Sequence, residues 1–228
     1  MSSDSPSDAE TVYRIATANR LLAADMFATL TPEQWRAPSL CAGWTVREIA
    51  AHLLDPLETK VGTLKLLVHL ARYRGSLDRM VDDTARKVAA RPTDELVTGL
   101  REHAPTRLTF PVIGPLGPMT DTCIHLRDAA RPLGLDVCPP PASWRPALDF
   151  LVSQPATRGF IIPRDRLTGL RFIATDQNWR HGDGPEILGS SEAIAMAISG
   201  RPVALDDLVG PGLDVLRPRI APSSPAKP

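Results

Sequence analysis

The sequence predicts an α+β protein in which an N-terminal antiparallel helical bundle is followed by a small α+β domain. Apolar residues recur at close to the helical period of 3.6 through most of residues 9–130. Three consecutive prolines, Pro139 to Pro141, then interrupt any regular element. Beyond them, Leu170 to Thr175 has the alternating pattern of a strand. The helical part and the strand-bearing part are therefore expected to form separate units.

The predicted organisation has four parts. Residues 9–135 form the helical bundle, and residues 136–157 form a linker that contains a bridging helix. Residues 158–218 form the small C-terminal α+β domain, and residues 219–228 form a disordered tail. A chain of 228 residues is long enough for two domains of ordinary size.

The first two helices carry the clearest signals. Residues 9–29 have a helical apolar period, which ends before Thr31-Pro32. The second helix is expected to begin at about residue 46, because Thr45 and Glu48 have the spacing of a capping box. His52 lies beside the apolar stripe of this helix, so its ring is expected to point inward.

The rest of the bundle follows in order. Residues 57–73 continue as helix, a charged segment covers residues 77–90, and a further helix runs from Thr93 to His103. A Gly- and Pro-rich loop then leads to a helix from about 119 to 130, which Arg131-Pro132 stops. Helices of this length joined by short loops favour an antiparallel bundle.

The C-terminal part has shorter predicted elements. A helix is expected around residues 145–153, a strand over 170–175, a turn over 176–184 and a second strand over 185–188. An Ala-rich helix over residues 191–199 should end at Gly200, because glycine commonly terminates helices.

Composition and charge exclude several functions. The chain has 26 basic and 26 acidic residues, so no long-range field attracts it to nucleic acid or to an anionic membrane surface. No apolar run approaches the length of a membrane span, and the polar start lacks the features of a secretory signal. A cytoplasmic protein that binds a small molecule is expected.

Residue usage adds two expectations. The three cysteines are few, odd in number and not arranged as CxxC, so reduced thiols are expected, and Cys41 is expected to have a packing role. Of the 26 basic residues, 22 are Arg and 4 are Lys, and there are 23 prolines. This usage is typical of a high-GC genome such as that of an actinobacterium.

Three residues form a candidate metal site. Asp121 and His125 are four residues apart and therefore share a helix face, and His52 comes from another helix. Two imidazoles and a carboxylate can bind a divalent cation such as zinc and leave one position open, which is typical of a catalytic site. Asp128, one turn beyond His125, is a candidate to orient an imidazole.

Each of these residues also has a structural interpretation. Asp121 in a first helical turn can simply interact with the helix dipole, and a single inward histidine is commonly a hydrogen-bonded core residue. Asp128 can be an ordinary exposed helix residue. The combination of His52, Asp121 and His125 with the Trp44 segment favours metal binding.

Together these residues resemble the mycothiol-dependent maleylpyruvate isomerase family, whose N-terminal domain is a DinB-like four-helix bundle. The resemblance covers nearly the whole chain. It is carried by Leu30 to Leu53, with Trp35, Cys41, Trp44 and His52 in the family pattern, by Asp121 to Gly134, and by a weaker C-terminal pattern from Gly169 to Arg201.

The resemblance implies an activity and its cofactors. Mycothiol would supply a thiol, which a divalent metal, expected to be zinc, would keep ionised so that it adds to a small electrophilic substrate. The outcome would be isomerisation or S-transfer. Arg201 matches an arginine of the family's second domain and is the implied catalytic residue, which pairs with a carboxylate.

One departure from the family leaves alternatives open. The family usually has Glu where this chain has the shorter Asp121. If that change has removed the metal, the bundle would be a non-catalytic module that binds a ligand or a partner. If water takes the place of the thiol, the protein would be a zinc hydrolase.

Overall fold

The structure is a computed structural model that describes residues 6–59, 73, 75–159 and 162–220. The chain divides into two units, Met1–Pro139 and Pro140–Pro228. Within the described residues, the helices of the first unit are α1 (Pro6–Ala28), α2 (Pro32–Arg36), α3 (Val46–Thr59), α5 (Leu77–Ala89), α6 (Thr93–His103) and α7 (Leu116–Ala130), followed by the 3₁₀ turn η1 (Arg131–Leu133).

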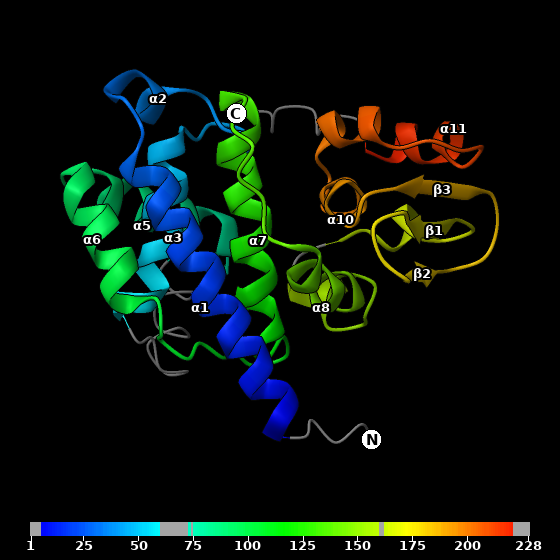
Figure 1. The fold of residues 1–228 in the computed structure, drawn as a ribbon, viewed down its shortest axis with the longest axis horizontal. Helices are drawn as coiled ribbons and strands as arrows, with labels where there is room; N and C mark the ends of the chain where they lie inside the picture. The colour runs from blue at the N-terminus through cyan, green and yellow to red at the C-terminus, as the bar shows by residue number, and fades with distance from the viewer. Residues whose placement is uncertain (1–5, 60–72, 74, 160–161, 221–228) are drawn as a thin grey trace. The chain divides into compact units, whose positions relative to one another are not determined.

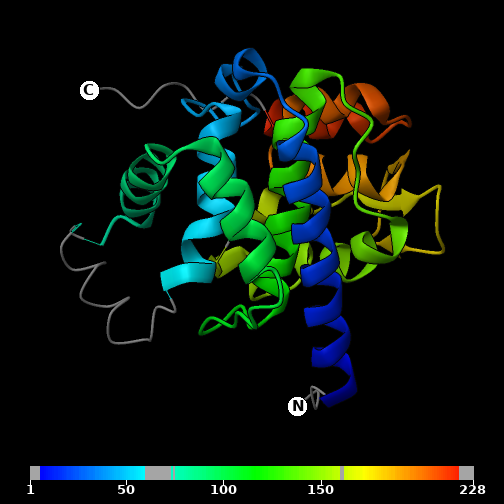
Figure 2. The ribbon, with the colours of Figure 1, turned by 60° about the vertical axis from the view of Figure 1, so that its left-hand side comes forward.

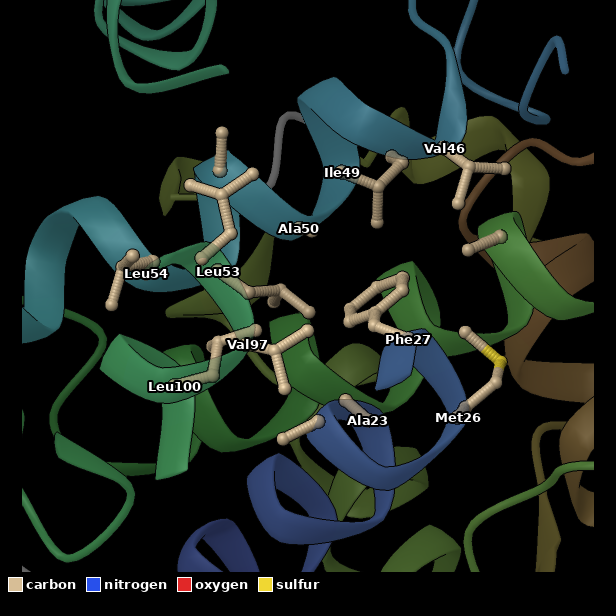
Figure 3. Close-up of a cluster of buried hydrophobic side chains, with 14 of the residues drawn as sticks. Ala23, Met26, Phe27, Val46, Ile49, Ala50, Leu53, Leu54, Val97 and Leu100 are labelled. Atoms are coloured by element: carbon tan, nitrogen blue, oxygen red, sulfur yellow. The ribbon is translucent and has the colours of Figure 1, made fainter. Parts of the chain in front are cut away.

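Helices α1, α3, α6 and α7 form a bundle (Figure 1). Both α6 and α7 pack against α1 and also against α3, so the four helices enclose one core, and α5 packs on the outside against α3 (Figure 2). Figure 3 shows Phe27, Ile49 and Val97 directed toward one another inside this core. Phe27 and Ile49 are fully buried, and Val97 is 7% exposed.

The start of α3 agrees with the sequence prediction. The helix begins at Val46, and the Glu48 carboxylate accepts a hydrogen bond from the Thr45 backbone at 2.8 Å. The Thr45 hydroxyl in turn accepts one from the Arg47 backbone at 3.3 Å. These bonds satisfy donors that a helix start otherwise leaves unpaired, and they fix where His52 lies along α3.

The charged segment 77–90 forms a helix, α5, that the sequence analysis did not assign. Ser76 caps its start by accepting a hydrogen bond from the Arg79 backbone, and Met80, Ala85 and Ala89 are the buried positions. The apolar residues Met80, Val81, Ala85, Val88 and Ala89 follow the helical period along one face, so the signal for this helix is present in the sequence, and the high charge of the segment led to its being left unassigned. Of the helix predicted over 57–73, residues 57–59 belong to α3 and residues 60–72 lie outside the described residues.

The second unit combines helices with a small sheet. Its helices are α8 (Pro141–Leu151), α9 (Ala156–Gly159), α10 (Ser191–Ile198) and α11 (Leu213–Leu216), and its 3₁₀ turns are η2 (Arg164–Arg166), η3 (Pro202–Asp207) and η4 (Arg217–Arg219). The strands β1 (Arg171–Ala174), β2 (Arg180–His181) and β3 (Glu186–Gly189) have the order β2-β1-β3.

The register of the sheet places apolar residues together. Strand β1 is antiparallel to β2 and parallel to β3, and Phe172 is opposite both His181 and Ile187. Every residue of α10 is buried, and α10 packs against α8, β1 and β3. The α+β class predicted from the sequence is confirmed.

Two elements of this unit differ from the sequence prediction. Helix α8 begins at Pro141, four residues before the predicted start, because proline is well tolerated at the first helical position. The segment 176–184, predicted as a turn, contains the short strand β2. A two-residue strand has no alternating pattern of its own, and its pairing with β1 depends on the sheet.

Gly182 and Gly169 provide a test of how tightly the sheet turns are packed. Both have positive φ, +80° and +70°, but a Cβ on Gly182 would overlap the Leu170 carbonyl oxygen, whereas a Cβ on Gly169 has open space. We expect Gly169→Ala to cost about 1 kcal/mol because of its backbone conformation alone. Gly182→Ala adds the overlap with the Leu170 carbonyl to this cost. Its melting temperature should therefore be at least about 4 °C lower than that of Gly169→Ala. Equal melting temperatures of the two variants would contradict this view of the turn.

Among the helices of the described residues, none is both long and apolar enough to cross a membrane.

Candidate metal centre

His52 is placed on one face of α3 by its apolar neighbours. Ile49 and Leu53 are buried in the bundle core, and the His52 side chain between these positions is 18% exposed. Because α3 packs against α7, the imidazole of His52 faces α7 rather than solvent. This position agrees with the inward orientation expected from the sequence.

Asp121 and His125 occupy successive turns of α7. Asp121 Oδ2 lies 3.1 Å from His52 Nε2, and Asp121 Oδ1 lies 3.3 Å from His125 Nε2. The carboxylate therefore uses one oxygen toward each imidazole. Ligand atoms around a tetrahedral zinc ion with bonds of about 2.0–2.1 Å are themselves about 3.3 Å apart. The ligand atoms of the three residues all lie within 4.8 Å of one another, so the shorter aspartate does reach both histidines.

Trp44 forms one wall beside the two histidines. Its ring centroid lies 5.3 Å from that of His52 and 6.3 Å from that of His125. The indole Nε1 donates a hydrogen bond of 2.8 Å to Asp82 on α5, and Asp82 also accepts from Arg86. Helix α5 thus fixes the orientation of the indole. The indole ring packs beside the imidazole rings of His52 and His125.

The far side of His125 meets a buried carboxylate. Asp128 Oδ2 lies 3.0 Å from His125 Nδ1, and the Asp128 side chain is fully buried. The same oxygen accepts a hydrogen bond from the Cys41 thiol at 3.1 Å, and Cys41 Sγ is 3.6 Å from His125 Nδ1. The two nitrogens of His125 therefore face two different carboxylates.

Charge pairing changes the pKa values at this site. Burial alone would raise the pKa of the Asp121 carboxyl, but the charges of His125 and His52 outweigh it and hold that pKa well below its usual range. Burial alone would lower the pKa of His125, but the charge of Asp121 and hydrogen bonds with Asp121 and Asp128 raise it well above its usual value. Without a metal, Asp121 and His125 form a carboxylate–imidazolium pair, in which a cation can replace the proton.

The structure brings together His52, Asp121, His125 and Asp128 of the predicted site residues. Arg201 lies in the second unit, immediately before η3, where its Nη1 donates to the Ser199 carbonyl at 2.7 Å. Its catalytic role stays a prediction. The sequence analysis missed the contacts of Cys41 and Asp82, which are 87 and 38 residues from their partners Asp128 and Trp44. No local pattern reports such pairs.

Comparisons with known proteins support the family resemblance. Residues 18–111 match the family described as the mycothiol maleylpyruvate isomerase N-terminal domain. A crystal structure of a point variant of the mycothiol-dependent maleylpyruvate isomerase is similar in fold, with a TM-score of 0.51 and 16% identity over 89% of this chain and 92% of that chain. The crystal structure of the mycothiol-dependent maleylpyruvate isomerase has a TM-score of 0.45 and 14% identity over the same shares. No curated protein matches the sequence. The family resemblance predicted from the sequence is confirmed over residues 18–111, the part of the chain that matches the mycothiol maleylpyruvate isomerase N-terminal domain family.

Proposed function

We propose that this protein is a metal-dependent, mycothiol-using isomerase or S-transferase that acts on a small electrophilic substrate. The observation that carries the proposal is the convergence of His52 Nε2, both Asp121 oxygens and His125 Nε2 at separations of 3.1 and 3.3 Å. The family of the N-terminal domain supports mycothiol as the thiol, because the name of that family includes it.

The donor set fits a divalent cation, for which zinc is the proposed metal. Two neutral imidazoles and one carboxylate are suitable zinc ligands, and three protein ligands leave a position for an exogenous group. When bound, the cation would supply the positive charge that keeps a thiol ionised at neutral pH. The three side chains are 12–32% exposed, so the proposed site is accessible to a small molecule.

The surrounding residues have supporting roles in this proposal. Asp128 holds His125 through Nδ1, so that Nε2 is directed toward Asp121 and the cation position. Trp44 packs beside both imidazoles and limits the access of water to them. Arg201 is proposed to pair with a carboxylate of the substrate or the thiol cofactor.

The direct test is whether turnover requires both the thiol and the metal. We expect the zinc-loaded protein to convert maleylpyruvate, or to conjugate monochlorobimane, only when mycothiol is present. A chelator should abolish this activity, and zinc should restore it. His125→Ala should be inactive, while His103→Ala, at the end of α6, serves as the matched control. Turnover of an ester or amide by the zinc-loaded protein without thiol would favour the zinc hydrolase instead.

A further inference from the structure

We propose that Cys41 is a positioning residue of the metal centre, whose thiol fixes Asp128 and, through Asp128, the ring of His125. This inference rests on the proposed function, since it concerns how one proposed metal ligand is held. It assigns a role to a thiol for which the sequence alone favoured packing.

The geometry forms a chain of three side chains. The Cys41 thiol donates to Asp128 Oδ2 at 3.1 Å, and this same oxygen lies 3.0 Å from His125 Nδ1. Cys41 Sγ is 3.6 Å from His125 Nδ1, so the sulfur lies beside the ring as well as beside the carboxylate. A hydrogen bond from Nδ1–H to Asp128 leaves the Nε2 lone pair for the cation.

Because Asp128 is buried, its contact with the Cys41 thiol helps to determine the position of the carboxylate. Its side chain is fully buried, so the carboxylate depends on protein donors for the hydrogen bonds that water would otherwise supply. Oδ2 accepts from Cys41 in addition to its contact with His125. Without the thiol, this oxygen loses one of the groups that set its position, and the His125 ring gains rotational freedom.

The loop that carries Cys41 is anchored independently of the thiol. The Leu40 backbone N–H donates to the Asp128 carbonyl at 3.0 Å, and the Cys41 backbone N–H donates to the Ser39 hydroxyl at 3.2 Å. The Val46 N–H donates to the Ala37 carbonyl at 3.0 Å. Because none of these bonds uses the Cys41 side chain, replacing that side chain is expected to leave the loop in place.

The test is a cobalt titration of the full-length protein and its variants. We expect Cys41→Ala and Cys41→Val, which lack a donor, to bind Co²⁺ about tenfold more weakly, within the range typical of residues that orient a metal ligand. Cys41→Ser should bind within about threefold of the parent, because a hydroxyl can also donate to Asp128. Cys138→Ser is the control for removing a thiol elsewhere and should bind like the parent.

Two results of the titration would overturn the proposal. Unchanged affinity in both donor-free variants would show that the thiol does not position His125. A thiolate-to-cobalt absorption band in the parent that disappears in Cys41→Ser would show that Cys41 is a metal ligand rather than a positioning residue.

An NMR measurement on metal-free protein separates this inference from the proposed function. The His125 Nδ1–H held against buried Asp128 should give a slowly exchanging proton resonance. That resonance should persist in Cys41→Ser and exchange faster in Cys41→Ala and Cys41→Val. If the parent binds no metal but shows this pattern, the proposed function fails and the positioning role stands. Identical exchange in the parent and the donor-free variants would refute the positioning role whatever the metal content.

Discussion

Replacing either His52 or His125 by alanine should eliminate stoichiometric metal binding. Each change removes one of three proposed ligands, so the loss in affinity should exceed the 10–100-fold that is typical when only an orienting partner is lost, and we expect more than about 100-fold. The measurement is metal content by mass spectrometry after zinc loading and dialysis, combined with competition against a chromophoric chelator. The two variants should lose metal to a similar extent, because each imidazole presents Nε2 to one oxygen of the same carboxylate.

His103→Ala is the matched control for this experiment. His103 lies in the last turn of α6, whereas the proposed ligands lie on α3 and α7. It belongs to neither group of residues that could hold a metal ion. It should retain a full equivalent of metal. Far-ultraviolet circular dichroism of each variant checks that the bundle is intact. Retention of one equivalent in folded His52→Ala or His125→Ala protein would refute the assigned ligand set.

The elements that position the ligands could be predicted because their signals are local. The start of α3 is specified by Thr45 and Glu48, whose bonds to backbone and side chain span only three residues. The spacing of Asp121 and His125 places them on one face of any helix, so their contact follows from helix geometry alone. The apolar stripe of α3 predicts that the His52 ring points inward, whereas its contact with Asp121 on α7 joins residues 69 apart.

The missing parts of the prediction depend on contacts between distant segments. Helix α5 itself has an apolar stripe that could have been recognised, but its contribution to the site is an indole–carboxylate bond between Trp44 and Asp82, 38 residues apart. The role of Cys41 appears only when its loop meets the buried Asp128. These pairings are determined by the tertiary arrangement of the bundle, which sequence spacing does not encode.

Asp121 is the residue for which the structure changes the expectation most. The sequence raised the concern that aspartate is too short, because the family usually has glutamate here. In the structure, its two oxygens already lie 3.1 and 3.3 Å from the two imidazole nitrogens, close to the ligand spacing of a tetrahedral zinc site. The backbone of α7 thus lies near enough to α3 for the shorter side chain, and loss of metal does not follow from its length.

Asp121→Asn and Asp121→Glu test this argument in opposite directions. Asp121→Asn replaces an anionic carboxylate ligand by a neutral amide, which is a poorer zinc ligand, so zinc affinity should fall more than about 100-fold. Asp121→Glu keeps the charge, and because the side chain is 32% exposed it has room to bend. Its affinity should stay within about tenfold of the parent.

Chelator competition at fixed pH and ionic strength measures both variants on one scale. Parent-like affinity in Asp121→Asn would show that the carboxylate is not a ligand and would favour a two-histidine site or none. Much tighter binding in Asp121→Glu would show that the aspartate does weaken the centre, as the comparison with the family first indicated. The expected order, parent close to glutamate and far above asparagine, follows because charge and reach are both needed, and the packing of α3 against α7 already supplies the reach.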